Sequence, residues 1–422
     1  MKHALLALAI GVGIQIGSVS ADDWPSFRGP AGNGLSAEKA APTTWAKDKN
    51  IKWRTELAMP GNGSPIVSNG KVFIAGTDDK EGKTRTLSCY DRKDGKLLWA
   101  AKVEYGKKAR THDTNTYSPT TPASDGKVVV VWHASAGLYC YDHAGKELWK
   151  RDLGEFDHMW GEGTSPVIHR DLVFLNSGPS TKKVFVVAVK LADGATVWEK
   201  EEPFKGDGDK NEVGGFIGSW STPLVVNFQG KDQVIFAMAA RVVAYAPEDG
   251  KLLWSCDGLR QEKGDLSYSS PILAGDTCVS VTGFGGPAIG VKLGGSGDVT
   301  ATHRVWRSEK NPENIGSGVL VDGNLYMPFK GPSVIGCIDP KTGAYLWKAK
   351  ATGTEMWGSM VHAAGRIYVT DQRGKTIVLK PNPEKLEVLE TNDLGERCNA
   401  TPAVSDGQIF IRTFKALYCI AE

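Results

Sequence analysis

The segment Cys89-Tyr-Asp91-Arg-Lys-Asp94-Gly95-Lys96-Leu-Leu-Trp99 decides the fold of this chain, because degenerate copies of it recur along the sequence. Its aspartate–glycine pair predicts a tight hairpin turn between two short strands, since glycine takes the positive φ that such turns require. The tryptophans of this register are spaced by 41 to 56 residues, at Trp53, Trp99, Trp149, Trp198, Trp254, Trp306 and Trp347. An internal repeat of this length indicates one repetitive domain rather than several unrelated ones.

A second marker alternates in phase with the tryptophans and centres on a small residue followed by proline or a substitute. Its eight copies are Gly63-Ser-Pro-Ile-Val, Thr121-Pro122-Ala, Thr164-Ser-Pro-Val, Ser221-Thr-Pro-Leu, Ser269-Ser-Pro-Ile, Gly316-Ser-Gly-Val, Gly358-Ser-Met-Val and Ala400-Thr-Pro-Ala. A further 41 residues beyond Trp347 the register reaches Val388, where we expect an eighth copy that has lost its tryptophan. Four short strands in about 40–55 residues are typical of a propeller blade.

The two ends of the repeat predict how the ring closes. The last unit, from Cys398 to Glu422, supplies three strands, and the segment from Ile51 to Leu57 supplies a fourth strand with no unit before it. Pairing these segments would remove the open seam of the ring. We therefore predict an all-β fold over residues 51–422, an eight-bladed β-propeller of four-stranded antiparallel blades. We expect it to be closed by pairing the N-terminal strand with the C-terminal blade, after an irregular N-terminal lead over residues 22–50.

Residues 1–21 have the pattern of a secretory signal peptide. Lys2 and His3 provide a positive start, and an almost uninterrupted apolar stretch follows over residues 4–16. Val19 and Ala21 are small residues at the −3 and −1 positions of a cleavage site. The apolar stretch is shorter than the roughly 20 residues that a membrane-spanning helix needs. We expect an exported protein, periplasmic or secreted, that is soluble after cleavage and has no membrane span.

The charge balance of the chain excludes one class of partner. The 50 lysines and arginines face 48 aspartates and glutamates in 422 residues, which leaves a formal net charge of +2. A protein that binds nucleic acid through its phosphates needs a clear basic excess, so we expect no nucleic-acid partner. We also expect a monomer.

Seven cysteines in an exported chain raise the question of disulfides, and the odd count leaves at least one thiol unpaired. Four of them occupy one repeated position, which alanine fills elsewhere, at Cys89, Cys140, Cys337 and Cys419. We interpret this position as a small buried apolar site, because free cysteine behaves as a small hydrophobe there. Cys256, Cys278 and Cys398 lie outside it, and a bridge between Cys256 and Cys278 stays open.

The copies that end at Trp99, Trp254 and Trp347 resemble the pyrroloquinoline quinone (PQQ) repeat, a small residue and an aspartate followed by a turn with glycine and by tryptophan. The resemblance covers residues 51–422, and the opening segment Asp23–Pro30 is similar to the lead of many exported PQQ-like propellers. It implies that the tryptophans pack between neighbouring blades. Since one fold hosts many functions, the repeat implies a fold more strongly than quinone binding.

Two branches of this family imply different functions. Quinoprotein dehydrogenases hold PQQ and calcium in the axial funnel, and the alcohol-oxidising members carry a disulfide between adjacent cysteines. This chain has no Cys-Cys pair and is much shorter than those enzymes. The other branch, the propeller subunit of the outer-membrane β-barrel assembly machinery, is similar in length and blade count. It is a lipoprotein, and the segment Gly17–Ala21 lacks the cysteine that a lipid anchor requires.

Long loops between units point to the axial mouth as the functional site, because binding residues tend to lie on loops that a rigid scaffold positions. These loops run over residues 104–117, 154–163 and 201–220. The residue three before each proline-box position should form a ring at the mouth, which reads Asn62, Pro119, Gly163, Trp220, Tyr268, Ile315, Trp357 and Asn399. Trp220, Tyr268 and Trp357 make one sector aromatic.

The candidate ligand-binding residues combine this aromatic sector with a polar one. They are Trp160, Trp220, Tyr268, Trp357, His112, His158, Glu162, Arg397 and Asn399. Such a site suits a planar or sugar-like ligand, or a peptide, and the competing interpretation is that the aromatic side chains only plug the channel. Metal binding by the two histidines and the glutamate has little support without a His-x-x-x-His pair, and Asp207-Gly-Asp209 lacks the rest of a calcium loop.

We therefore expect a protein- or ligand-binding or assembly scaffold without catalysis, with no cofactor and with a protein or glycan partner at the axial mouth. The chain has no Gly-x-Ser-x-Gly elbow and no phosphate-binding loop, so a nucleophilic hydrolase has no visible support. The alternative is a quinoprotein oxidoreductase, an alcohol or sugar dehydrogenase that depends on PQQ and calcium.

Overall fold

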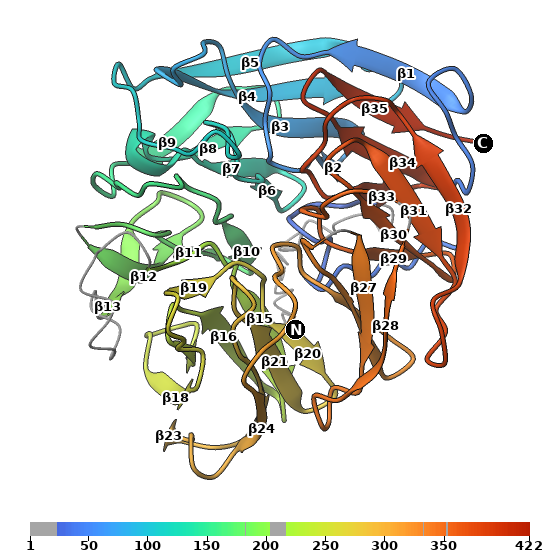
Figure 1. Cartoon of the computed structure of the whole chain (residues 1–422). Helices are drawn as coiled ribbons and strands as arrows, with labels where there is room; N and C mark the ends of the chain where they lie inside the picture. The colour runs from blue at the N-terminus through green and yellow to red at the C-terminus, as the bar shows by residue number, and fades with distance from the viewer. Residues whose placement is uncertain (1–22, 182, 203–216, 332, 352) are drawn as a thin grey trace, which may run out of the picture.

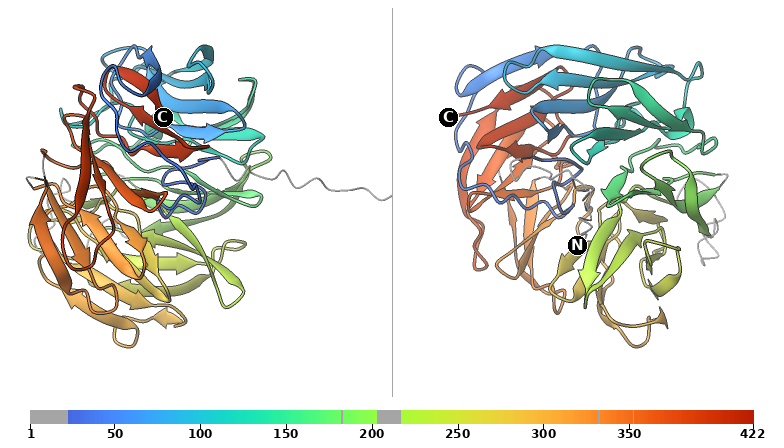
Figure 2. Two further views of the ribbon diagram at one scale, coloured as in Figure 1. Left: turned by 90° about the vertical axis from the view of Figure 1, so that its right-hand side faces the viewer. Right: turned by 180° about the vertical axis from the view of Figure 1, so that it is seen from behind.

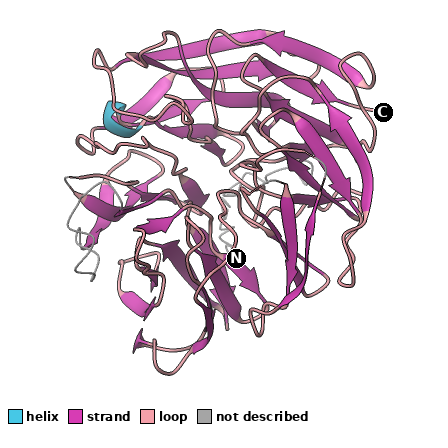
Figure 3. Cartoon of the chain, viewed as in Figure 1, coloured by secondary structure: helices cyan, strands magenta, loops and turns pink. Residues whose placement is uncertain are grey.

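The computed structural model describes residues 23–181, 183–202, 217–331, 333–351 and 353–422, which form a ring of eight β-sheet blades (Figure 1). Figure 2 shows the same ring from the side and from behind. Among the described residues the only helix is the 3-10 turn η1 (Ala134–Ala136), and strands dominate the rest (Figure 3). The predicted all-β, eight-bladed propeller is confirmed. The predicted signal peptide, residues 1–21, lies outside the described residues.

The four strands of each blade are antiparallel and are hydrogen-bonded in chain order, except that the N-terminal strand completes the last blade. Blade 1 consists of β2 (Ile66–Ser68), β3 (Lys71–Thr77), β4 (Thr84–Asp91) and β5 (Leu97–Glu104). Blade 2 consists of β6 (Ala123–Ser124), β7 (Val128–Trp132), β8 (Leu138–Asp142) and β9 (Glu147–Arg151). Blade 3 consists of β10 (Val167–His169), β11 (Leu172–Asn176), β12 (Val184–Lys190) and β13 (Thr196–Glu202). Blade 4 consists of β15 (Leu224–Phe228), β16 (Lys231–Ala237), β17 (Arg241–Tyr245) and β18 (Leu252–Asp257).

The second half of the ring repeats this order. Blade 5 consists of β20 (Ile272–Ala274), β21 (Thr277–Val281), β22 (Ala288–Lys292) and β24 (Arg304–Ser308). Blade 6 consists of β25 (Val319–Val321), β26 (Asn324–Pro328), β27 (Val334–Ile338) and β28 (Tyr345–Lys350). Blade 7 consists of β29 (Val361–Ala363), β30 (Arg366–Thr370), β31 (Lys375–Leu379) and β32 (Val388–Asp393). Blade 8 consists of β33 (Ala403–Ser405), β34 (Gln408–Arg412), β35 (Ala416–Ile420) and β1 (Ile51–Glu56).

Blades 4 and 5 share two additional strand contacts that the other blades lack in the described part of the chain. A short parallel pair joins β14 (Ile217–Ser219) to β19 (Asp265–Ser267). The second contact is β23 (Gly297–Asp298), which pairs in parallel with β18 through Trp254 and Gly297. The longer connection between β22 and β24 therefore extends the sheet of blade 4, which explains the degenerate fifth copy of the repeat.

The register of each blade explains the small-residue position. In seven blades this residue lies directly opposite the tryptophan of the fourth strand, in the pairs Cys89–Trp99, Cys140–Trp149, Ala188–Trp198, Ala244–Trp254, Gly290–Trp306, Cys337–Trp347 and Cys419–Trp53. A β-bulge follows each pair and re-aims the strand. A large side chain opposite the indole would fill the space that the indole needs.

The predicted position of the eighth copy, at Val388, was wrong by two residues. In blade 7, Val388 pairs with Leu379, whereas Glu390 pairs with Val378 and occupies the tryptophan register. The connection between the third and fourth strands is two residues longer there than in blade 1. A count from the preceding tryptophan therefore stops two residues early.

The tryptophans join neighbouring blades, as the repeat implied. Trp198 of blade 3 donates from Nε1 to the carbonyl oxygen of Pro247 in blade 4 at 2.7 Å. Its ring lies over Gly250, where a Cβ atom would come within 2.6 Å of Trp198 Cδ2. The junction between blades 4 and 5 differs, because Trp254 donates to the side-chain oxygen of Gln233 in its own blade at 2.8 Å.

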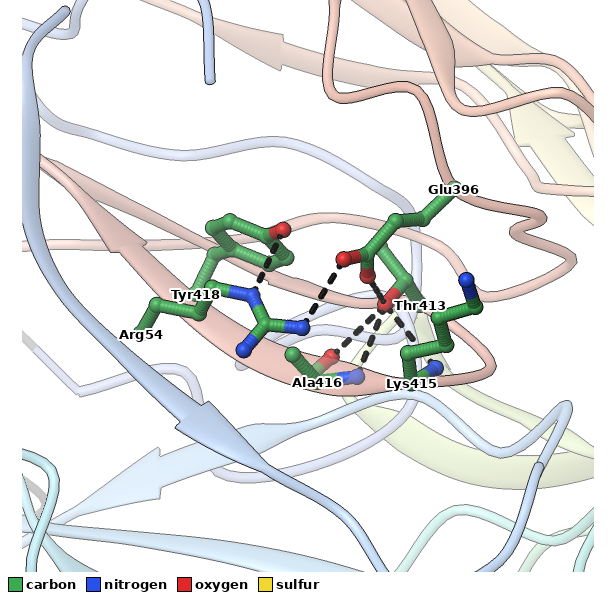
Figure 4. Close-up of polar contacts among 6 residues, drawn as sticks. All are labelled: Arg54, Glu396, Thr413, Lys415, Ala416 and Tyr418. Carbon is green, nitrogen blue, oxygen red and sulfur yellow. Dashed lines mark hydrogen bonds and ion pairs between the residues drawn. The ribbon is translucent and has the colours of Figure 1, made fainter. Parts of the chain in front are cut away.

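The ends of the chain meet in blade 8, where β1 pairs antiparallel with β35 and the C-terminus lies beside it (Figure 1). Arg54 on β1 donates to the hydroxyl of Tyr418 at 3.0 Å and to Glu396 at 2.9 Å (Figure 4). Thr413 also donates to Glu396, at 2.5 Å. Burial would raise the pKa of Glu396, but the hydrogen bonds from Thr413, Arg54 and Tyr418 outweigh it and hold that pKa below its usual value.

All seven cysteines are buried and free. The four in the repeated position are fully buried opposite or near the tryptophans, in agreement with the small apolar site. No bridge joins Cys256 to Cys278, so that alternative was wrong. Both thiols pack in one hydrophobic cluster between blades 4 and 5.

The N-terminal lead has no regular strand, and its backbone contacts several blades. Trp24 pairs with Val67 of blade 1, and the Arg28 guanidinium donates to the carbonyl oxygen of Gly318 in blade 6. Phe27 lies between these two contacts and lines the central cavity. Trp45 stacks on Tyr368 of blade 7 with ring centroids 6.5 Å apart. The lead thus ties blades that are not neighbours in the ring.

Candidate functional site: the axial cavity

All eight predicted ring positions line one cavity at the axis of the propeller, with a volume of ≈ 420 Å³. This volume lies within the range of about 300–1,000 Å³ that is common for small-molecule sites. The ring residues precede the first strand of each blade, so the propeller fixes their positions around the axis.

A belt of hydroxyl residues lies two positions after the ring residues and joins the blades. At six of the eight junctions, a backbone N–H of one blade donates to the serine or threonine hydroxyl of the next, at 2.9–3.0 Å. At the seam, for example, the N–H of Thr401 donates to Ser64. These bonds link the segments just before the first strands of neighbouring blades, so backbone N–H groups and short buried hydroxyl side chains hold the wall of the cavity in place.

Four aromatic rings form one side of the cavity. Trp220 lies 5.1 Å from Tyr268 and 6.2 Å from Trp160, measured between ring centroids. Phe284 closes the group edge-on, 5.2 Å from Trp160 and 6.3 Å from Tyr268. Trp220 is fixed further because its Nε1 donates to the carbonyl oxygen of Gly161 at 2.9 Å. These contacts are typical of favourable aromatic pairs and make a rigid apolar surface.

The absence of a side chain at Gly163 is part of this arrangement. A Cβ atom at Gly163 would lie 2.7 Å from Cδ1 of Trp220. The ring position on blade 3 is therefore small because the indole of blade 4 covers it.

Side-chain amides form the opposite, polar side. Asn62 donates to Asn115 at 2.9 Å and accepts from Asn399 at 3.3 Å, and Gln372 donates to Asn399 at 3.2 Å. Asn115 also donates to the carbonyl oxygens of Trp160 and Glu162, so it joins the polar side to the aromatic one. Amides offer both donors and acceptors to a ligand.

The charged groups of the cavity are mostly acidic. Among the described residues that line it, Lys330 is the single lysine or arginine, and it pairs with Glu313 at 3.1 Å. Glu355 accepts a hydrogen bond from Nε1 of Trp357 at 3.4 Å. The net charge of these groups favours a neutral or cationic ligand, because an anion would meet unpaired carboxylate.

Glu162 and His158 are titratable groups in unusual surroundings. Oε2 of Glu162 is buried without a hydrogen-bond partner, and burial raises the pKa of this carboxyl to about 8 against the opposing effect of Arg85. His158 is 1% exposed and lies behind Trp220, with ring centroids 5.0 Å apart. Burial and Arg110 lower the pKa of His158 to about 4. Both side chains are therefore mostly uncharged at neutral pH.

The predicted site residues do not all reach the cavity. Trp160, Trp220, Tyr268, Trp357, His112, Glu162 and Asn399 line it. His158 supports the aromatic side from behind, and Arg397 lies instead over the ring of Phe414, 4.9 Å from its centroid. Asp207-Gly-Asp209 lies outside the described residues.

Five cavity residues were missed because they lie outside the ring positions, the proline boxes and the predicted loops. They are Phe27 of the lead, Phe284, Glu313, Lys330 and Glu355. Phe284 and Lys330 lie between the second and third strands of their blades, whose loops reach the same mouth. A periodic sequence pattern does not mark such loops.

The described residues contain no group of three or more histidine, cysteine, aspartate or glutamate side chains that could hold a metal ion. They also contain no helix that is long and apolar enough to cross a membrane. The arrangement offers recognition of an apolar face by the aromatic side and of polar groups by the amide side.

Comparison with known proteins gives one family and a common fold. A family model described as outer membrane protein assembly factor BamB matches residues 43–118, 83–328 and 331–420. No curated protein sequence matches the chain.

Three solved structures show the likeness in fold. BamB from Moraxella catarrhalis has 14% identity and a TM-score of 0.61, with 87% of this chain and 98% of that chain covered. The quinohemoprotein alcohol dehydrogenase from Comamonas testosteroni has 12% identity and a TM-score of 0.69, with 94% and 80% covered. A europium-containing methanol dehydrogenase has 12% identity and a TM-score of 0.70, with 96% and 98% covered. At these identities the likeness concerns the fold alone.

Proposed function

Because the chain belongs to the family of the outer membrane protein assembly factor BamB, we propose that it is an exported binding or assembly scaffold that holds part of a partner in its axial cavity. The observation that carries this proposal is the rigid aromatic side formed by Trp160, Trp220, Tyr268 and Phe284 opposite a polar side of amides. A site of this kind binds by apolar contact and takes its orientation from a few hydrogen bonds.

The chemistry of the cavity narrows the bound group. Glu313 is neutralised by its ion pair with Lys330, and Glu162 is mostly protonated at neutral pH. Glu355 accepts a hydrogen bond from Nε1 of Trp357. The group should therefore be neutral or cationic, with a flat apolar face and hydrogen-bonding edges. A sugar ring offers this chemistry, and so does an aromatic or basic side chain of a protein partner.

The same charges disfavour the alternative of a quinoprotein oxidoreductase. Pyrroloquinoline quinone carries three carboxylates, whereas the described part of the cavity wall offers one lysine, Lys330, which is already paired, and no arginine. Calcium takes about six to eight oxygen ligands, and the described residues offer no cluster of three acidic or histidine side chains for it. The cavity residues therefore do not fit this cofactor, and we derive no oxidation step from them.

Isothermal titration of residues 22–422 tests the proposal with three probes: neutral oligosaccharides, short peptides rich in aromatic and basic residues, and PQQ with calcium. We expect the protein to bind either the oligosaccharides or the peptides. The probe that binds shows whether the partner is a glycan or a protein. Trp220→Ala and Trp357→Ala should each weaken it by about tenfold or more, the size expected when a buried aromatic contact is lost. Leu98→Ala, which removes an exposed side chain of β5, should leave binding unchanged.

Two results would overturn the proposal. Calcium-dependent binding of PQQ together with dye-linked oxidation of alcohols or sugars would establish the oxidoreductase. Binding of oligosaccharide or peptide that survives both tryptophan substitutions would remove the axial cavity from the function.

A further inference from the structure

A second, smaller cavity of ≈ 20 Å³ lies beside the axial cavity, between blades 1, 2 and 3. Glu162 and Pro119 line both cavities. The remaining walls include Arg85 of β4, Trp132 at the end of β7 and His133 beside it. About 10–15 Å³ is enough to hold a single water-sized species, so this cavity has room for one.

Several polar atoms of the lining residues are buried and have no hydrogen-bond partner within the described part of the chain. They are Nε of Arg85, Oγ1 of Thr111, Nε1 of Trp132, Nε2 of His133 and Oε2 of Glu162. Buried polar atoms are nearly always hydrogen-bonded, because leaving one unpaired costs about 1–3 kcal/mol. Five such atoms around one small cavity indicate that it contains a polar occupant.

The charge of the cavity decides between water and an ion. Arg85 is 5% exposed, and its Nη1 donates to the carbonyl oxygen of Tyr117, whose ring centroid lies 5.2 Å from the guanidinium carbon. It forms no ion pair with any carboxylate in the part of the chain that the structure describes. Burial lowers the pKa of Arg85 to about 10, so the guanidinium remains charged at neutral pH.

The other titratable groups on this cavity do not balance that charge. Glu162 is the single carboxyl group among its described lining residues and is mostly protonated at neutral pH, because burial raises its pKa to about 8. His133 is neutral, because burial and Arg85 lower its pKa to about 3. Arg110, at the exposed edge, adds a second positive charge. An uncompensated buried cation is costly, and a neutral water molecule would leave it uncompensated.

We propose that this cavity is a binding site for one small monovalent anion, a halide ion of the size of chloride, held by the N–H groups of Arg85 and Trp132 and the hydroxyl of Thr111. The donors match such an ion, since all three carry a hydrogen, belong to residues that line the cavity and have no hydrogen-bond partner among the described residues. The site does not require a ligand in the axial cavity, although the two cavities share Glu162. An anion in the small cavity also affects the axial cavity through Glu162, because a nearby negative charge favours the protonated form of this carboxyl.

Bromide tests the proposal directly, because its anomalous scattering marks its position in a crystal. Crystals of the mature protein grown with bromide in place of chloride should give an anomalous difference peak between Arg85, Thr111 and Trp132. A cavity that holds only water, with no anomalous peak at saturating bromide, would overturn the proposal.

Thermal unfolding of the wild type and of single-residue variants tests the proposal in solution. At millimolar salt, where the general stabilising effect of sulfate is small, we expect the midpoint of thermal unfolding to rise more with chloride or bromide than with sulfate at equal ionic strength. Thr111→Val should weaken the apparent halide affinity by about tenfold, since one hydrogen bond to a charged group is worth roughly 1.5 kcal/mol, and Arg85→Met should abolish it. Lys341→Met, which removes an exposed charge on blade 6, is the control and should keep the full halide effect. If Arg85→Met fails to fold, the Thr111→Val result still decides, and an unchanged halide response there contradicts the proposal.

Discussion

Nη1 of Arg412 in blade 8 donates a hydrogen bond of 2.6 Å to the carbonyl oxygen of Ala75 in blade 1. The same atom donates to the carbonyl oxygen of Gly63 at 3.2 Å, and Nη2 donates to the hydroxyl of Ser118 at 3.3 Å. A Cβ atom at Gly61 would lie 1.8 Å from Nη2. One buried guanidinium thus connects three successive parts of the ring at the seam where the chain ends meet.

Replacement of this arginine should open the seam. We expect Arg412→Met to lower the free energy of unfolding by about 3 kcal/mol, because the carbonyl oxygens of Ala75 and Gly63 would remain buried without donors. Urea unfolding measures the change. Lys415→Met, an exposed substitution near the same strand, is the matched control and should lie close to wild type. Equal stability of the two variants would show that the guanidinium does not hold the seam.

Glu396 should make the protein sensitive to acid. Its pKa is lowered in the folded state, so its contribution to stability is present above the unfolded value of 4.5 and is lost as the pH falls through the folded value. Because Arg54 is partly exposed, we expect the contribution to be at most about 1 kcal/mol. In Glu396→Gln the fall in stability on acidification should be smaller than in wild type. Urea unfolding at a series of pH values compares the two, and parallel curves would contradict this role.

Glu162 should have the opposite pH dependence. Its pKa is raised to about 8 in the folded protein, so the folded state binds a proton that the unfolded state releases between pH 4.5 and 8. Stability should therefore decrease as the pH rises across this window, and Glu162→Gln should remove that decrease. Glu355→Gln, at another carboxyl of the axial cavity, should keep it. The same series of unfolding measurements would reject the assignment if both variants behaved alike.

Alanine substitutions at two glycines with similar backbone geometry separate the effect of the contact between a tryptophan and the next blade from the effect of the backbone. Gly250 has φ of +66° and lies beneath Trp198, whereas Gly230 has φ of +78° and no atom within 4 Å of a Cβ position. Alanine at either site should cost about 1 kcal/mol or more for the left-handed backbone. Gly250→Ala should cost about 1–3 kcal/mol more than Gly230→Ala, because the indole must also move. A difference near zero in thermal unfolding would mean that the tryptophan adapts freely.

The sequence predicted the features that repeat from blade to blade. Positions such as Trp220 and Asn399 could be assigned to the axial ring because each stands at a fixed distance from the proline box, and all eight ring positions line one cavity. The tryptophan contacts followed from the family resemblance. Val388 was misplaced because a turn in blade 7 is two residues longer, and a count along the chain cannot detect that without the strand partner.

The rest of the site depends on contacts that recur in no other blade. Phe27 reaches the cavity from the lead, and Phe284 and Lys330 reach it from loops inside their blades. Arg397 has the right register but turns toward Phe414. Arg412 could not be predicted either, since an arginine in a strand is usually exposed and its burial depends on carbonyl groups about 340 residues earlier.

The pairing of β1 with β35 also sets the order of events during synthesis. Ile51 and Ile420, which face each other in blade 8, are separated along the chain by the seven other blades. Those blades can assemble as they emerge from the ribosome, yet β1 must wait until β35 has been made before it finds its neighbour. Contacts of such long sequence separation form slowly. A chain without β35 would leave the edge of β1 unpaired, so the ring closes only with a strand that is translated long after β1.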